Sequence, residues 1–100
     1  MIYVDPLVEY EGIPWKGRKG RPQSCHLFTD GAPAELMRFA FSIRLPLAWY
    51  QPSPPASWPH FDLSPMWRAR AIEAGAREVS HREGAEIRRA ARAAAGAPAA

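Results

Sequence analysis

The chain of 100 residues is predicted to fold as a small α/β or α+β domain, with a single sheet of about four to five short strands and two to three helices. Apolar residues recur at every second position in some segments, which is typical of strands, and about every 3.6 positions in others, which is typical of helices. The 11 prolines fall mainly between these segments and indicate stiff connecting loops. A hydrophobic content of 47% is ordinary for a globular protein and argues against disorder of the whole chain.

Ile2–Asp5 is predicted to be the first strand, because its residues favour β structure and alternate in polarity. The alternation exposes Tyr3 and Asp5 on the face opposite the two aliphatic residues. Residues 9–23 show no period and are predicted to form a loop, with one turn of strand near Ile13.

Ser24–Asp30 alternates again and is predicted to be a second strand or extended segment. His26, Phe28 and Asp30 point to one side, and Leu27 points to the other. The first of these faces therefore carries two polar side chains beside an aromatic ring.

Pro33–Arg44 is predicted to be the first helix, because apolar residues return at helical spacing. Asp30 precedes it as a capping residue, Glu35 complements the positive end of the helix dipole, and Pro46 prevents continuation. Ala48–Gln51 follows and is predicted to be a short aromatic strand.

His60–Leu63 is the next predicted strand, after a stiff proline-rich loop at 52–59. The second helix is predicted over Pro65–Ala74, because Ser64 is a good N-cap and proline suits the first helical position. Gly75 stands where a left-handed residue would end this helix.

Arg77–Ser80 is predicted to be a strand, and the unit from His60 to Ser80 could be a right-handed crossover between parallel strands. Gly84–Ala95 is rich in alanine and arginine and is predicted to be helical. We therefore expect one compact domain over residues 1–83, followed by a C-terminal helix with a frayed tail over residues 84–100.

Cys25 is the only cysteine, which excludes an internal disulfide and a cysteine-rich zinc site. Strand alternation puts Cys25 and His26 on opposite faces, which argues against a Cys–His nucleophile pair. The first residues do not form a signal peptide, and no stretch approaches the roughly 20 apolar residues needed to span a bilayer. We therefore expect a cytoplasmic protein with no membrane partner.

Histidine and aspartate side chains recur on the polar faces of three predicted strands. His60 and Asp62 share one face of the strand, while its two apolar residues take the other. Ligands of open α/β sheets gather beyond the carboxyl ends of the strands, where Asp5, Asp30 and Asp62 are expected. We therefore predict four catalytic residues that meet at one sheet edge, namely His60, Asp62, His26 and Asp5.

Such a cluster could work in two ways, as a mixed nitrogen and oxygen site for a divalent metal or as a general acid/base pair. The two histidines lie 34 residues apart, without the spacing of a known metal motif, so no cofactor is identified. In the alternative without a function, Asp62 pairs with a nearby arginine and His60 makes one hydrogen bond.

Four further residues are predicted to bind a ligand. Arg68 and Ser64 stand at the start of the second helix, where a phosphate could be received, although the position of Arg68 favours a structural salt bridge over anion binding. Trp58 could stack on a base if it lines the His60 edge, and it otherwise belongs to the core. Asp30, at the end of its strand, is the fourth residue predicted to bind the ligand.

The net charge of +3 is unevenly distributed. Residues 16–21 hold four cations, Lys16, Arg18, Lys19 and Arg21. The last third adds seven arginines, Arg68, Arg70, Arg77, Arg82, Arg88, Arg89 and Arg92. This basic surface could attract phosphates, or it could be the ordinary charged surface of a soluble protein.

The favoured hypothesis is a small enzyme or binding protein for a phosphate-bearing or nucleotide-like molecule, with a His/Asp cluster at its strand ends. The alternative is a non-enzymatic module that binds nucleic acid or protein through the basic loop 16–21 and the C-terminal arginines. A third hypothesis, docking to a larger partner through the last helix, needs an apolar stripe that IRRAARAAA hardly offers.

The ordered blocks IYVD, CHLFTD with ELMRFAFSIRL, AWYQ, and WPHFDLSPMWRARAIEAGAREVSHRE carry a family resemblance. Over about Met1–Glu83 the chain resembles DUF4031, a family of small bacterial and phage proteins of unknown function. The alanine-rich tail lies outside this resemblance. The resemblance implies one compact domain and assigns no catalytic residue.

Overall fold

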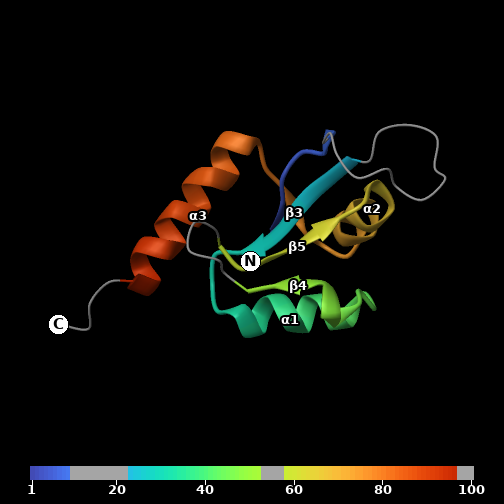
Figure 1. Ribbon diagram of the computed structural model, residues 1–100, viewed down its shortest axis with the longest axis horizontal. Coiled ribbons are helices and arrows are strands. Elements are labelled where there is room, and N and C mark those ends of the chain that lie inside the picture. The colour runs from blue at the N-terminus through green and yellow to red at the C-terminus, as the bar shows by residue number, and fades with distance from the viewer. Residues whose placement is uncertain (10–22, 53–57, 97–100) are drawn as a thin grey trace.

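The computed structural model describes residues 1–9, 23–52 and 58–96, which form three α-helices and a mixed sheet (Figure 1). The strands are β1 (Ile2–Val4), β2 (Val8–Glu9), β3 (Gln23–Thr29), β4 (Tyr50–Gln51), β5 (His60–Leu63) and β6 (Arg77–Glu78). The helices are α1 (Pro33–Ser42), α2 (Pro65–Glu73) and α3 (His81–Gly96), with a short 3₁₀ helix η1 (Leu47–Trp49). The predicted class is thus confirmed, in its α+β form.

The sheet has the strand order β4-β5-β3-β1-β6, and β2 pairs with the outer part of β3. The β1–β6 pair is parallel and the other pairs are antiparallel. It follows that β5 and β6 run in the same direction, as predicted. They are not neighbours, however, because β3 and β1 lie between them and α2 crosses both.

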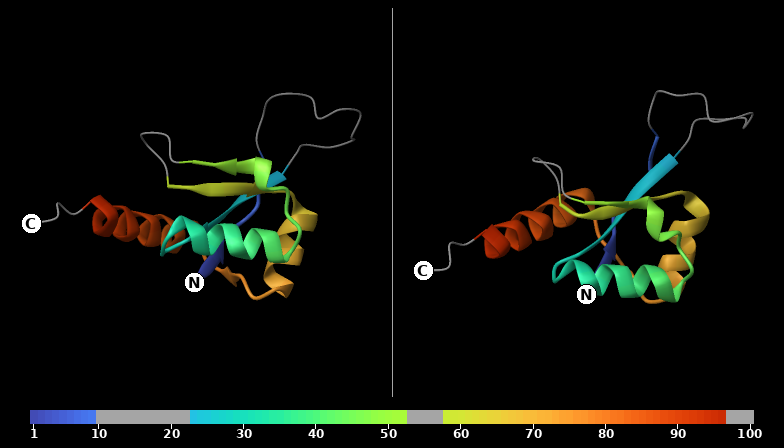
Figure 2. Two further views of the ribbon diagram at one scale, coloured as in Figure 1. Left: turned by 90° about the horizontal axis from the view of Figure 1, so that it is seen from below. Right: turned by 60° about the horizontal axis from the view of Figure 1, so that its bottom comes forward.

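One face of the sheet holds the main apolar core. Its buried strand residues alternate along the sequence, as at Val4 in β1, Leu27 in β3 and Phe61 in β5. Leu36 of α1 and Ala71 of α2 pack against them, and Figure 2 shows both helices on this side of the strands. The remaining side chains of β1, β3 and β5 therefore point to the opposite face.

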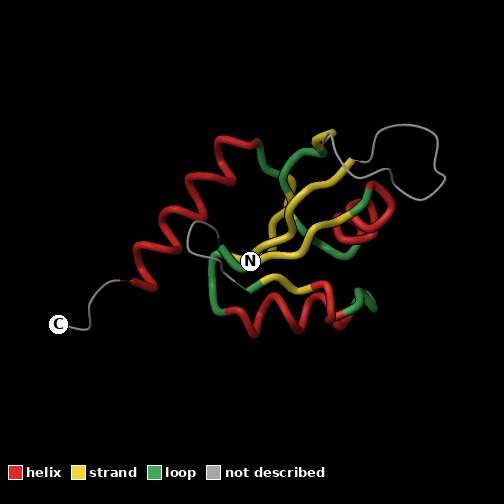
Figure 3. The backbone as a smooth tube through the Cα atoms, in the orientation of Figure 1, coloured by secondary structure: helices red, strands yellow, loops and turns green. Residues whose placement is uncertain are grey.

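That opposite face is covered in part by α3, which continues away from the sheet (Figure 3). Tyr3, Phe28 and Val79 form a small second core there, with Trp58 packed against it. The exposure predicted for Tyr3 is wrong, since this side chain is only 8% exposed. What remains uncovered is the polar part of the face.

Helices α1 and α2 end in the same hydrogen-bonding pattern. The amide of Leu45 donates to the carbonyl of Ala40, and the amide of Ala76 donates to the carbonyl of Ala71, both at 2.9 Å. Each ending needs one residue with a positive φ, which is Gly75 (109°) in α2, as predicted. In α1 this residue is Arg44 (63°), so α1 ends at Ser42, before the predicted Arg44.

Two further predictions around α1 need correction. Asp30 is not its cap, because Ala32 occupies the N-cap position without a side-chain hydrogen bond. The strand predicted at Ala48–Gln51 is formed only at Tyr50–Gln51, since the amide of Trp49 donates to the carbonyl of Pro46 and makes a 3₁₀ turn.

Helix α3 begins at His81, three residues before the predicted start at Gly84. The cause is a capping box, in which the amide of Glu83 donates to the Ser80 hydroxyl and the amide of Ser80 donates to the Glu83 carboxylate. The predicted start of the last helix at Gly84 therefore lies inside α3. The strand expected over Arg77–Ser80 is limited to its first two residues.

Several predictions lie outside the described residues. They are the strand turn near Ile13, the basic loop 16–21, most of the proline-rich loop 52–59 and the frayed end of the tail.

Candidate functional site

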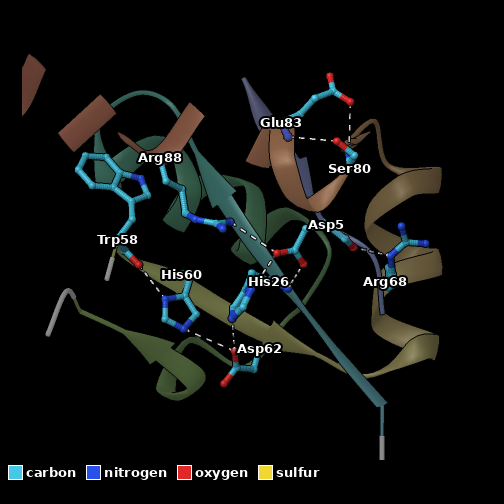
Figure 4. Close-up of polar contacts among 9 residues, drawn as sticks. All are labelled: Asp5, His26, Trp58, His60, Asp62, Arg68, Ser80, Glu83 and Arg88. Atoms are coloured by element: carbon cyan, nitrogen blue, oxygen red, sulfur yellow. Dashed lines mark hydrogen bonds and ion pairs between the residues drawn. The ribbon is translucent and has the colours of Figure 1, made fainter. Parts of the chain in front are cut away.

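The strand register brings three polar side chains together in the middle of the sheet. His26 of β3 stands directly opposite Asp62 of β5, and His60 precedes Asp62 by two positions on the same face. Figure 4 shows the three side chains converging above the strands. We call His26, His60 and Asp62 the His–His–Asp cluster.

His26 is oriented by Asp5, which follows β1 and is buried, with 2% of its side chain exposed. The His26 ring atom Nδ1 lies 2.8 Å from Asp5 Oδ2, and the His26 amide donates to Asp5 Oδ1 at 2.6 Å. Burial alone would raise the pKa of the Asp5 carboxyl, but these hydrogen bonds outweigh it and lower the pKa. An ionised Asp5 thus fixes the ring and turns its Nε2 outward.

His60 is oriented by a backbone group instead. Its Nδ1 lies 2.7 Å from the carbonyl oxygen of Trp58, which can only accept, so Nδ1 carries the proton. Its Nε2 lies 3.5 Å from Asp62 Oδ1. The interaction with Asp62 raises the pKa of His60 despite partial burial of the ring.

Asp62 completes the cluster from the solvent side, with 48% of its side chain exposed. Its Oδ1 lies 3.8 Å from His26 Nε2, while its Oδ2 accepts a hydrogen bond from Gln51 Nε2. The hydrogen bond with His60 lowers the pKa of this carboxyl. The rings of His26 and His60 meet edge to face, with centroids 5.0 Å apart.

A pocket of about 430 Å³ opens beside the cluster. It is lined by Asp5, Val8, Ser24, His26 and Asp62. Two of the three cluster residues, His26 and Asp62, therefore form part of the pocket wall, and a small molecule in the pocket would meet an imidazole and a carboxylate.

The four predicted catalytic residues thus come together, but not where they were expected. They lie on the face of three inner strands, because β3 and β5 are flanked on both sides by other strands. The exposure predicted for Asp5 is wrong. Its burial follows from α3, whose Arg88 lies 3.5 Å from Asp5 Oδ2 and stacks over the Phe28 ring at 4.7 Å.

Asp30 does not join the other carboxylates, and its predicted place beside Asp5 and Asp62 is wrong. Because β3 runs antiparallel to β1, Asp30 lies at the opposite end of the sheet. There it accepts hydrogen bonds from the Tyr3 hydroxyl at 3.0 Å and from the terminal amine of Met1.

The other predicted ligand-binding residues have structural contacts. Ser64 caps α2 by accepting from the Trp67 amide. Arg68 donates to the backbone oxygen of Asp5 at 3.0 Å and pairs with Glu78 at 3.3 Å, so its guanidinium braces the strand end that carries Asp5. Ligand binding by these two residues stays a prediction.

Trp58 has two structural contacts as well. Its indole nitrogen donates to the carbonyl of Thr29 at 2.7 Å, while its own carbonyl orients His60. Its ring packs against the second core. The sequence interpretation missed that its backbone, rather than its ring, reaches the cluster.

Gln51 and Arg88 contact the carboxylates of the site, and neither contact was predicted. Both depend on long-range pairing, since Gln51 meets Asp62 through the β4–β5 register and Arg88 arrives from α3. Cys25 behaves as expected, since it is buried on the other face and burial raises its pKa to about 12. The Cys25 thiol therefore lies apart from the His26 ring, on the other face of the sheet.

No helix of the described segments is both long and apolar enough to cross a membrane. Searches of curated proteins and of solved structures each return no match. A family model described as "Protein of unknown function (DUF4031)" matches residues 2–91, which extends the predicted resemblance beyond Glu83 and further along α3. The match covers nearly the whole chain, which therefore belongs to the DUF4031 family.

Proposed function

We propose that this protein is a small hydrolytic enzyme for a phosphate-bearing or nucleotide-like molecule, with its active site at the pocket beside the His–His–Asp cluster. One observation carries the proposal. Both imidazoles have Nδ1 held by an internal acceptor, and both turn Nε2 toward the same carboxylate at the pocket wall.

The hydrogen bonds of Asp5 orient an exposed imidazole as well as supporting the fold. Keeping a carboxylate charged in a site as buried as Asp5 costs desolvation energy. The charged Asp5 carboxylate fixes the ring of His26, whose side chain is still 48% exposed. Fixed imidazoles beside a pocket are typical of acid/base sites, in which a carboxylate sets the orientation of a ring.

The groups of the site then have distinct roles. Asp5 and the Trp58 carbonyl act as positioning groups, whereas the two Nε2 atoms and Asp62 Oδ1 face the position of the attacking water molecule. In the reaction, the water oxygen forms a bond to phosphorus while the bond between phosphorus and the ester oxygen breaks. One water proton passes to the cluster and from there to the departing ester oxygen. The pocket volume is in the range of small-molecule sites.

A thermal-shift screen with nucleotides and phosphate esters, followed by assay of the hits for release of phosphate or alcohol, tests the proposal. We expect ligand-induced stabilisation and turnover in the wild type, loss of both in His60→Ala, and wild-type behaviour in His81→Ala. The second variant removes an exposed histidine from the start of α3 and serves as the matched control. Hits that act equally on the wild type and His60→Ala would refute the assignment of the site.

Nucleic-acid binding through α3 is a second candidate. It is favoured by the exposed Arg89 on a helix that extends away from the sheet (Figure 1). Such binding would weaken steeply as salt rises. Retention of the protein on a DNA or RNA column at low salt tests it, and passage without retention would exclude it.

A further inference from the structure

We infer that the His–His–Asp cluster is the binding site of one divalent transition-metal ion, held by His26 Nε2, His60 Nε2 and Asp62 Oδ1. The binding itself does not depend on the proposed function. Its role does, because the ion would hold the water that the proposed hydrolysis consumes.

The spacing of the three atoms suits a metal ion. One ligand atom from each of the three residues lies within 4.8 Å of the other two, and Asp62 Oδ1 lies 3.5 Å from one Nε2 and 3.8 Å from the other. Bonds of about 2.0–2.1 Å to a tetrahedral ion place neighbouring ligand atoms roughly 3.4 Å apart. Binding therefore requires the side chains to close in by a modest movement, and Asp62 is exposed enough to rotate.

The hydrogen bonds behind the ligand atoms are an independent observation. A histidine that binds a metal through one ring nitrogen usually donates its other N–H to a carboxylate or a backbone carbonyl. His26 has a carboxylate partner in Asp5, and His60 has a carbonyl partner in Trp58. In Asp62 the second oxygen is held by Gln51, which leaves Oδ1 for the ion. Each of the three ligands is thus oriented in advance.

The charge of the pocket also favours a cation. Asp5 and Asp62 both line it, and bare phosphate would meet two carboxylates there. A divalent ion would neutralise these two charges and present a cation to the phosphate. Because the protein supplies three ligands, open positions remain for water and for a phosphate oxygen, which is the arrangement of catalytic metal sites.

The ligand types indicate which metals bind. Two imidazoles with one carboxylate suit zinc, cobalt or iron(II), and the combination with open positions is that of mononuclear catalytic centres. Magnesium and calcium prefer all-oxygen ligands. We therefore expect Zn²⁺ and Co²⁺ to bind and Mg²⁺ not to bind at the same concentration.

Isothermal titration of tag-free, chelator-treated protein with Zn²⁺ tests the inference, and the visible absorption of bound Co²⁺ reports the coordination. We expect one equivalent to bind. Loss of an outer hydrogen-bond partner weakens metal sites by about 10–100-fold, so loss of a direct ligand in His60→Gln or Asp62→Asn should cost at least about 100-fold. The control His81→Gln should bind like the wild type.

Absence of saturable binding, or equal binding by the wild type, His60→Gln and Asp62→Asn, would overturn the inference. Asp62→Asn is the decisive variant, since an exposed and nearly isosteric change leaves the fold intact, which circular dichroism verifies. Hydrolysis that continues unchanged in a chelator would refute the role of the metal in the reaction and would leave the proposed function standing. Stoichiometric Zn²⁺ binding without any turnover or ligand binding would support the metal site and refute the proposed function.

Discussion

At the scale of single residues, the two histidines of the site are held in different ways. The partner of His26 is a buried charge, Asp5, and the partner of His60 is the neutral carbonyl of Trp58. Substitutions at the site should therefore differ in their cost to the fold. The side chains that carry buried hydrogen bonds are structural as well as functional, whereas the exposed Asp62 is chiefly functional.

Asp5→Ala should lower the free energy of unfolding by about 3 kcal/mol, because two donors of His26 and the guanidinium of Arg88 lose a buried acceptor. Urea denaturation followed by circular dichroism measures this. Asp62→Ala, at a half-exposed position, should cost less than about 1 kcal/mol. Equal losses in the two variants would contradict the roles assigned to them.

In the metal-free protein, the pKa of His60 is raised above its ordinary value of 6.5, mainly by the hydrogen bond with Asp62. The contribution of His60 to stability is therefore complete below pH 6.5 and is lost as the pH rises through the pKa of the folded state. Asp62→Asn should lower the pKa of His60. An NMR titration of the imidazole in the presence of a chelator measures it, and an unchanged pKa would exclude Asp62 as the cause.

At this scale, strand alternation was sufficient to place His60 beside Asp62 and to give Asp5 and His26 matching faces. It could not fix the direction in which neighbouring strands run. The predicted place of Asp30 was wrong for that reason. The carboxyl ends of two strands lie at the same end of a sheet only if the strands are parallel, and β1 and β3 are antiparallel. Gln51 was missed because its contact depends on the register of a two-residue strand.

At the scale of elements, the matching ends of α1 and α2 provide an internal comparison. Both need a left-handed residue, which costs an ordinary L-residue about 1–2 kcal/mol and glycine almost nothing. The α2 end has Gly75, whereas the α1 end has the exposed Arg44. The first helix therefore ends with a strain that the second one avoids.

Arg44→Gly should raise the free energy of unfolding by roughly 0.5–1 kcal/mol, since relief of strain exceeds the added entropy of the unfolded chain. Gly75→Ala should lower it by about 1–2 kcal/mol, through the backbone alone, because an added Cβ there meets nothing within 4 Å. Urea denaturation of both variants tests the pair. A change of the same sign in both would contradict this reading of the helix ends.

Helix α3 reaches the sheet at Gly84, where an added Cβ would lie 3.4 Å from both Phe28 and Arg88. Gly84→Leu should overpack this contact, at a cost of about 1–3 kcal/mol, and should move Arg88 away from Asp5. Gly96→Leu, on the same helix but with open space around it, is the control. Thermal unfolding separates the two, and similar melting temperatures would show that α3 does not pack as described.

Helix boundaries were more predictable than short strands, because local residues determine them. Ser64 and Gly75 bound α2 as expected, and the Ser80 and Glu83 pair contained a start signal for α3 that was overlooked. Strands of two residues have no comparable local signal, since only their partners define them.

At the scale of the whole molecule, the sheet separates two tasks. One face buries the main core under α1 and α2, and the other combines a small core under α3 with an open polar area (Figures 1 and 4). The fold class and alternation could be predicted from the sequence. The central position of the site could not, because the strand order β4-β5-β3-β1-β6 depends on pairings between distant segments.

A crystal structure of the protein grown with Zn²⁺, with anomalous diffraction recorded at the zinc edge, tests most directly whether the three side chains form one site. The expected result is one strong peak on the open face of the sheet, about 2.0–2.1 Å from His26 Nε2, His60 Nε2 and Asp62 Oδ1. A map without a peak at these atoms, with the two Nε2 atoms turned away from Asp62, would contradict it.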